Sequence, residues 1–210
     1  MWLNLADLAY DVTTLGPGRR IVVWVQGCLL RCPGCISPEW QPLRANQLVR
    51  VDELAERLLE RPDHHGLTLS GGEPMLQARS LLRLWRLVQV GQPEWNLIVF
   101  SGFTRRQLLT EGQPDRVGLL LAADAFIAGP YLQAENESRG LRGSANQEIF
   151  FGPRSRFDTA DRRELLAGAR RVEVRIEPHR VLIIGIPIPN LRAGTPRWTT
   201  PCPTGDRGEQ

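Results

Sequence analysis

Short apolar runs separated by amphipathic segments dominate the first two thirds of the chain. Residues 20–25 (Arg-Ile-Val-Val-Trp-Val) are apolar and rich in β-branched side chains, which predicts a strand buried on both faces. Three more short runs, at 67–69, 96–100 and 125–128, predict further strands, and each run ends close to a glycine. The pattern therefore predicts at least four short strands.

Helical patterns lie between these strands. Residues 51–60 repeat apolar side chains at helical spacing, and a later segment places Leu81, Trp85 and Val88 on one face. Strands that alternate with helices imply right-handed βαβ units and a mainly parallel sheet. In such sheets functional residues lie in the loops that follow the carboxyl ends of the strands. We therefore expect the chemistry of this chain in those loops.

The last third has a different pattern. Asp161 and Glu164 resemble a capping box that opens a helix. Residues 172–177 alternate apolar and charged side chains, which predicts a half-exposed antiparallel strand that turns at 178–180 into a second strand at 181–186. Proline, glycine and threonine dominate after Pro187 and predict a loose tail. We expect a core (1–151), a helix and hairpin packed on it (152–188), and a flexible tail (189–210).

Composition excludes several classes of function. The 210 residues are 42% hydrophobic and 23% charged, and all 26 cationic residues are arginine. Without lysine, the chain cannot form a Schiff base or use a P-loop lysine. A net charge of +3 gives no argument for binding nucleic acid, no apolar run is long enough to span a membrane, and the first residues do not resemble a signal peptide. We expect a cytoplasmic protein.

The cysteines are the strongest chemical signal. Cys28, Cys32 and Cys35 follow the first predicted strand within eight residues, whereas Cys202 lies in the predicted tail. Three thiols on one tight loop favour a metal centre. Structural zinc requires four ligands, while an iron–sulfur cube held by three thiolates leaves its fourth iron open to a small molecule. The spacing favours the iron–sulfur alternative over zinc or incidental thiols, with Cys202 as a bystander.

Two motifs together resemble the radical S-adenosylmethionine (SAM) enzymes. The Cys-x-x-x-Cys-x-x-Cys pattern of residues 28–35 is similar to the cluster motif of that superfamily, and Ser-Gly-Gly-Glu-Pro at 70–74 is similar to its second motif. More specifically, the chain resembles the activases of glycyl radical enzymes, and within them the activating proteins of anaerobic ribonucleotide reductase. The stretches that carry this closer resemblance are 16–19, 24–28, 32–35, 67–70, 101–104 and 142–147.

The resemblance implies a fold, cofactors and a reaction. It implies an α/β fold, a partial (incomplete) TIM-like (β/α) barrel with a mainly parallel sheet, to which this chain adds an antiparallel hairpin. It implies a [4Fe–4S] cluster and SAM, which is reductively cleaved to a 5′-deoxyadenosyl radical that abstracts hydrogen. The substrate would be a glycine of a partner enzyme such as anaerobic ribonucleotide reductase, with a flavodoxin or ferredoxin as electron donor.

The same resemblance assigns tasks to individual residues. The glycines of the second motif would let backbone groups approach the methionine amino group, and Glu73 would supply negative charge there or fix the turn. Ser101 would bind the methionine or ribose portion. Arg19 and Asp124 are weaker candidates for orienting cofactor or substrate. The expected metal ligands are Cys28, Cys32 and Cys35, and the expected cofactor-binding residues are Gly34, Cys35, Ile36, Gly71, Gly72, Glu73, Pro74 and Ser101.

Alternatives remain open. His64 and His65 are expected in an exposed loop, and residues 142–147 are either a polar turn or a site for docking a partner protein. The extra hairpin at the carboxyl terminus also fits a radical SAM enzyme that modifies a peptide or a small metabolite. A non-catalytic metal-binding module is the third alternative.

Overall fold

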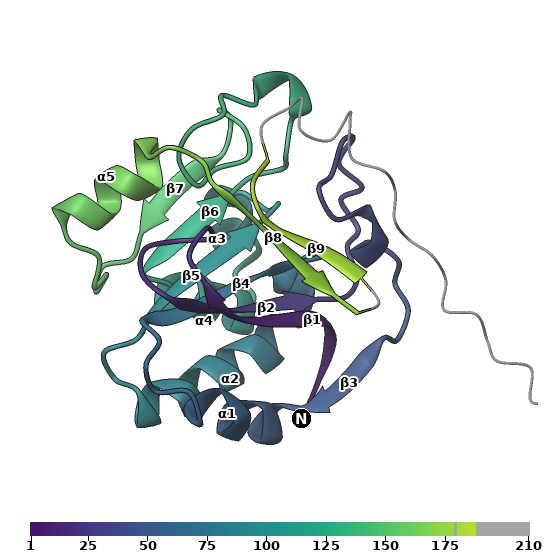
Figure 1. Cartoon of the computed structure of the whole chain (residues 1–210), viewed down its shortest axis with the longest axis vertical. Coiled ribbons are helices and arrows are strands. Elements are labelled where there is room, and N and C mark those ends of the chain that lie inside the picture. The colour runs from purple at the N-terminus through teal and green to yellow at the C-terminus, as the bar shows by residue number, and fades with distance from the viewer. Residues whose placement is uncertain (179, 188–210) are drawn as a thin grey trace, which may run out of the picture.

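The structure is a computed structural model that describes residues 1–178 and 180–187, and it is built around one large sheet (Figure 1). This sheet has seven strands in the order β3-β1-β2-β4-β5-β6-β7, and β8 and β9 form a separate hairpin. The strands are β1 (Trp2–Val12), β2 (Arg20–Val25), β3 (Gln47–Arg50), β4 (Gly66–Gly71), β5 (Asn96–Ser101), β6 (Ala125–Ala128), β7 (Glu148–Phe151), β8 (Val172–Glu177) and β9 (Arg180–Gly185).

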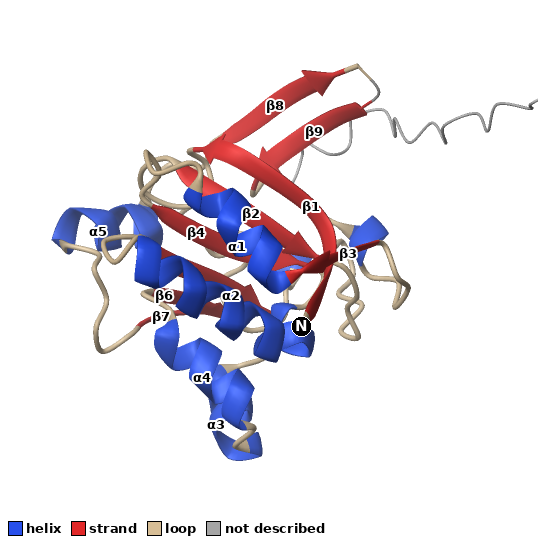
Figure 2. Ribbon diagram, turned by 90° about the horizontal axis from the view of Figure 1, so that it is seen from below, coloured by secondary structure: helices blue, strands red, loops and turns tan. Residues whose placement is uncertain are grey.

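Four of the five described helices pack on one face of the large sheet (Figure 2), and the last in chain order packs against the other face. The helices are α1 (Val51–Leu59), α2 (Ala78–Gly91), α3 (Arg105–Glu111), α4 (Pro114–Ala122) and α5 (Thr159–Ala167), with short 3-10 helices η1 (Pro38–Trp40), η2 (Pro74–Gln77) and η3 (Gln133–Glu135). The apolar sides of α1, α2 and α4 pack on β2, β4 and β5. Parallel strands followed by helices in an open sheet form an incomplete (β/α) barrel, so the predicted fold class is confirmed.

The parallel strands are in register at their carboxyl ends. Val25 of β2 pairs with Gly71 of β4, and Ser101 of β5 pairs with Ala128 of β6. β4 and β5 are paired from Gly66 to Leu69. Because the four strands run in the same direction, the loops that follow them leave the sheet at one edge. That edge carries both motifs found in the sequence.

A buried arginine joins the opposite edge of the sheet. Arg20 is completely buried at the start of β2. Its guanidinium donates to Thr68 Oγ1 (2.7 Å), to the Leu67 carbonyl (2.6 Å) and to Asn96 Oδ1 (2.6 Å). Burial lowers the pKa of Arg20 to about 9, a shift that is acceptable only because its donors are paired. The amino ends of β2, β4 and β5 are thereby fixed to one another.

Several strands and helices of the structure were not predicted from the sequence pattern. β1 pairs antiparallel with both β2 and β3, and β7 pairs antiparallel with β6. β1 does not alternate cleanly because its pairing with β2 shifts register between Leu5 and Asp7 and again between Ala9 and Val12. α3 and α4 were also missed, although α3 opens with a capping box at Thr104.

The cap of α5 also differs from the prediction. The helix begins at Thr159 and its capping box joins Asp158 to Asp161, one turn before the predicted pair. Asp161 thus closes the box and does not open it. The helix ends at Ala167. The predicted tail at 189–210, Cys202 and the turn residue His179 lie outside the described residues.

The hairpin β8–β9 is confirmed, but its charged face points inward. Glu173 accepts from the Thr13 backbone N–H (2.6 Å) and Arg175 donates to the Tyr10 carbonyl (2.7 Å), so two of the three charged side chains of β8 contact β1 or the residue that follows it. From β9, Ile184 packs on the sheet face away from α1 and α2. The opposite face of the hairpin is apolar and solvent-exposed, and Ile176 is its most exposed member at 84%.

The assignment of the buried and exposed faces of the hairpin can be tested with a matched pair of substitutions. Ile184 is only 1% exposed, so Ile184→Ala should lower the free energy of unfolding by about 2–5 kcal/mol. Ile176→Ala, in the same hairpin, should change it by less than about 0.5 kcal/mol. Urea unfolding measures both values. An equal loss in the two variants would contradict the assigned faces.

Candidate functional site

The candidate site lies at the carboxyl edge, where backbone hydrogen bonds connect consecutive loops. The Gly72 N–H donates to the Val25 carbonyl (2.7 Å), and the Glu73 N–H donates to the Gly27 carbonyl (2.8 Å). These bonds join the loop after β4 to the loop after β2. At the next strands, the Gly129 N–H donates to the Ser101 carbonyl (3.0 Å). The loops therefore form one connected surface.

The cysteine loop curls tightly after β2. Cys28, Cys32 and Cys35 are all partly buried. The Leu30 N–H donates to Cys28 Sγ (3.4 Å), and the Cys35 N–H donates to the Cys32 carbonyl (3.1 Å). Arg31 has a φ of 49°, a left-handed conformation that residues other than glycine rarely adopt. Such backbone strain is characteristic of loops shaped for a ligand.

The donor set of this loop fits an iron–sulfur cluster. Iron–sulfur clusters are held by cysteine thiolates, and their potential depends on hydrogen bonds to sulfur; the Leu30 N–H already supplies such a bond to Cys28. Burial raises the pKa of the Cys28 thiol, so the thiolate needs a cation beside it. In the described part of the chain no group of three or more His, Cys, Asp or Glu side chains is already close enough together to hold a metal ion.

Glu73 connects the ends of β4 and β5. Its carboxylate is buried and accepts from the Met75 N–H (2.9 Å) and the Ser101 hydroxyl (2.8 Å) through Oε1, and from the Gly102 N–H (2.8 Å) through Oε2. Burial raises the pKa of Glu73, and these hydrogen bonds oppose the shift. Of the two tasks expected for Glu73, the geometry displays the one that fixes the turn.

The two glycines of the second motif lie against the cysteine loop. A Cβ on Gly71 would be 2.3 Å from the Val25 nitrogen, and one on Gly72 would be 2.3 Å from the Gly27 oxygen. Gly71 also has a φ of 109°. Side chains at these positions would push the second motif away from the cysteine loop. In this structure the close approach made by these glycines is to backbone of the chain itself.

Other predicted cofactor-binding residues share this edge. Pro74 is buried at the start of η2, where its fixed φ suits the first helical position. Gly34 is exposed beside Cys35, and Ile36 is 37% exposed just after it. Ser101 is buried, and its hydroxyl donates to Glu73. All of the predicted cofactor-binding and metal-ligating residues therefore lie at strand ends or in loops at one edge of the sheet.

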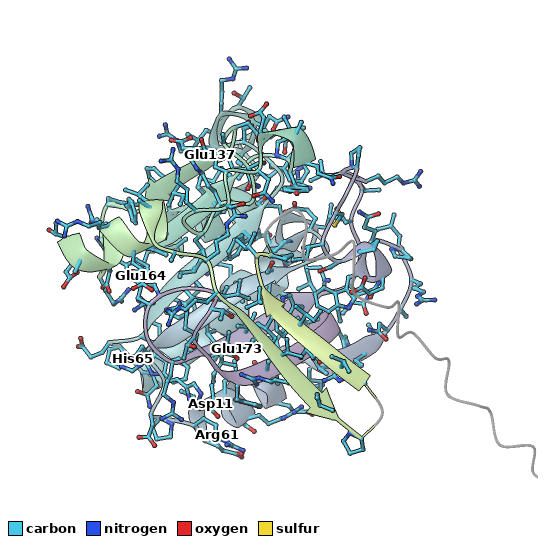
Figure 3. All side chains as sticks on the ribbon, turned by 45° about the horizontal axis from the view of Figure 1, so that its top comes forward. Asp11, Arg61, His65, Glu137, Glu164 and Glu173 are labelled. Atoms are coloured by element: carbon cyan, nitrogen blue, oxygen red, sulfur yellow. The ribbon has the colours of Figure 1, made fainter. Side chains whose placement is uncertain are left out.

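Two weaker candidates lie at the other edge. Arg19 precedes β2 and pairs with Asp11, which is marked in Figure 3. Asp124 precedes β6, where its carboxylate accepts from the Leu97 N–H (2.7 Å) and pairs with Arg156. Both residues therefore stabilise the amino edge of the sheet, away from the cysteine loop.

The histidine prediction was wrong for one residue. His65 is exposed and accepts from the Arg19 N–H (3.1 Å), but His64 is 7% exposed. The His64 ring is edge-on to Tyr10 and Trp95, and its Nδ1 lies 2.9 Å from the Arg61 carbonyl. Adjacent positions point in opposite directions, so one ring enters the core while the other faces solvent.

The polar motif at 142–147 folds the loop that follows β6. Gln147 accepts from the Gly143 N–H (2.7 Å) and donates to the Gly129 carbonyl (2.7 Å), while Asn146 donates to the Pro130 carbonyl (2.8 Å). Arg142 pairs with Glu137, a residue labelled in Figure 3. The motif therefore has a clear structural task. Sequence reasoning missed Gln133 in the same loop, which contacts Gly34 of the cysteine loop.

Comparisons with known proteins agree with this geometry. Residues 14–150 match a family described as a 4Fe-4S single cluster domain. The chain is 33% identical over 142 residues to the anaerobic ribonucleoside-triphosphate reductase-activating protein of Vibrio cholerae, a match that covers 64% of this chain and 88% of that protein. It is 39% identical over 79 residues to the pyruvate formate-lyase-activating enzyme of Staphylococcus aureus, covering 35% of this chain and 32% of that enzyme.

Among solved structures, QueE from Escherichia coli resembles the fold with a TM-score of 0.41 and 15% sequence identity, over 50% of this chain and 54% of that one. Within the described residues, none of the helices is both long and apolar enough to cross a membrane. The family match covers most of the chain and includes the cysteine loop and both motifs. The chain therefore belongs to the 4Fe-4S single cluster family, among the radical SAM activating enzymes.

Proposed function

We propose that this chain installs a glycyl radical on a partner protein, as an activating enzyme for an anaerobic ribonucleotide reductase. The observation that carries the proposal is the match to the Vibrio cholerae activating protein, which extends over 88% of that protein. The shorter match to a pyruvate formate-lyase-activating enzyme supports the same class of reaction. Because the reaction needs a low-potential electron, a flavodoxin or ferredoxin would be its donor in the cell.

The cofactors of this family are a [4Fe–4S] cluster and SAM. When bound and reduced, they supply a 5′-deoxyadenosyl radical that takes a hydrogen atom from the substrate. Cys28, Cys32 and Cys35 would hold the cluster through three thiolates. The loop after β4 would hold the methionine end of SAM beside it, since Gly72 is hydrogen-bonded to the last residue of β2 and Glu73 to Gly27 at the start of the cysteine loop.

The open carboxyl edge suits a substrate that is itself a protein. Apolar side chains on its loops are solvent-exposed, among them Leu29 and Ile36 in the cysteine loop and Leu132 after β6. Apolar residues at a rim give a transient partner a surface to dock against.

The proposed function predicts a glycyl radical on the partner. The reconstituted protein should be incubated without oxygen with SAM, dithionite and the anaerobic ribonucleotide reductase from the same genome. We expect a doublet in the electron paramagnetic resonance (EPR) spectrum, carried by the reductase, and no doublet with Cys32→Ala. Formation of 5′-deoxyadenosine without any doublet would contradict the proposal and favour modification of a peptide or small metabolite.

Each of the three cysteines of the loop should be necessary for binding the cluster. Cys28→Ala, Cys32→Ala and Cys35→Ala should each lose most of the bound iron and the formation of 5′-deoxyadenosine, because each removes a ligand of the cluster. Cys202→Ala, which removes the thiol outside the loop, should retain both. Iron content and chromatography of the nucleoside measure these effects. Full activity in a variant of the loop would refute its assignment as a ligand.

Substitution of Glu73 should weaken SAM binding and remove a pH dependence. In Glu73→Gln an amide N–H₂ must face a backbone donor, at an expected cost of about 1–3 kcal/mol. Because the pKa of Glu73 is raised in the folded protein, the parent loses stability as pH rises from the ordinary glutamate range through that raised value. Glu73→Gln should lack this loss.

Chemical unfolding across pH 4–8 measures this difference, and equilibrium binding of SAM to the cluster-loaded protein measures the affinity. Glu94→Gln is the matched control, since Glu94 is exposed in the connection before β5. It should behave as the parent in both assays. Identical pH profiles for Glu73→Gln and the parent would contradict the assigned role of burial.

A further inference from the structure

Gln133 packs against the cysteine loop between two of its expected ligands. Gly34 separates Cys32 from Cys35, and a Cβ at Gly34 would lie 2.2 Å from Gln133 Oε1 and 2.9 Å from its Cδ. A side chain at Gly34 would therefore displace the Gln133 carboxamide from its present place. Gly34 also has a φ of 72°, which glycine adopts without strain. The carboxamide therefore lies directly on the backbone between the two cysteines.

The loop that carries Gln133 is fixed on both sides of it. The Leu132 N–H donates to Ser144 Oγ (3.0 Å), and the Ala145 N–H donates to the Glu135 carbonyl (2.7 Å). Ser144 is completely buried. These bonds attach the segment around η3 to the polar motif at 142–147. The Gln133 carbonyl also accepts from the Asn136 N–H (3.3 Å), so the backbone on both sides of Gln133 is held by hydrogen bonds.

An arginine from the carboxyl-terminal part of the chain holds the same loop. Arg170, which follows α5, donates to Asn136 Oδ1 (2.6 Å) and the Gly140 carbonyl (3.3 Å). It also donates to the carbonyl of Arg142. A single guanidinium therefore bridges three points of the loop. Through these contacts, the segment beyond the family match is connected to the cysteine loop.

We propose that Gln133 is a positioning residue for the iron–sulfur cluster, held in place by Arg170. It would keep the backbone between Cys32 and Cys35 in its ligating shape and present its amide donors to the sulfur atoms of the cluster. Gln133 is solvent-exposed, and Oε1 is the atom of its carboxamide nearest the Gly34 position, so the N–H₂ group remains available as a donor. Hydrogen bonds to sulfur stabilise the more negative reduced cluster and therefore raise its reduction potential.

This inference rests on the proposed function only through the cluster, and its test needs neither SAM nor a partner. Gln133→Met removes the amide donors and keeps the length of the side chain. Gln113→Met is the matched control, because Gln113 is an exposed residue before α4 whose side chain makes no capping bond. Both variants are reconstituted without oxygen, and the reduced cluster is followed by EPR during a redox titration.

In Gln133→Met, the ratio of reduced to oxidised cluster should fall roughly tenfold at the potential that half-reduces the parent. Release of iron to a chelator should be roughly 10- to 100-fold faster. Gln113→Met should match the parent in both measurements. A Gln133→Met protein that unfolds at the parental temperature but takes up no cluster would also support the proposal.

Arg170→Met tests independently whether the contacts of Arg170 hold the loop that carries Gln133. It should increase amide hydrogen exchange in residues 131–135 and move the cluster potential in the same direction by a smaller amount. A Gln133→Met variant with the parental potential and the parental rate of iron release would overturn the proposal. That outcome would leave the glycyl radical activity untouched, because the two experiments share no readout.

Discussion

The architecture of the site depends on one buried carboxylate. Glu73 accepts three hydrogen bonds, from the Met75 N–H, the Ser101 hydroxyl and the Gly102 N–H. Its own N–H donates to the carbonyl of Gly27 in the cysteine loop. An ionised group that is removed from water must be matched by donors, and here the donors come from the ends of two neighbouring strands. The match between carboxylate and donors therefore fixes the distance between the two strand ends and the cysteine loop.

The opposite edge of the sheet is fixed by two other buried ionisable side chains, which also need hydrogen-bond partners. The buried Arg20 and Asp124 bind backbone and side-chain partners at the amino ends of the parallel strands. Because polar groups anchor the strands at that edge, the loops at the carboxyl edge are free to carry strained and exposed residues. Arg31, with its left-handed backbone, and the exposed Leu29 are examples. The polar groups that anchor the strands and the loops that form the candidate site thus lie at opposite ends of the same strands.

Local patterns predicted the parts of the fold that depend on local chemistry. The four parallel strands and the cysteine loop were predictable because apolar runs and cysteine spacing are properties of contiguous sequence. The inward side of the hairpin was not, since Glu173 and Arg175 face β1 only because they find backbone partners more than 150 residues away. His64 was misjudged for the same reason, since its pocket is formed by Tyr10 and Trp95.

Gln133 could not have been predicted from sequence, because its contact with Gly34 joins two loops that meet only in the folded sheet. The glycine in the cysteine motif was the available signal, since it marks a point where another group comes close to the backbone. The central claim remains that three thiolates leave one iron of a [4Fe–4S] cluster open to SAM. Its most direct test is the EPR spectrum of the reduced cluster before and after addition of SAM. We expect the spectrum to change on addition, whereas a spectrum that SAM leaves unaltered, or stoichiometric zinc in place of iron, would contradict the account.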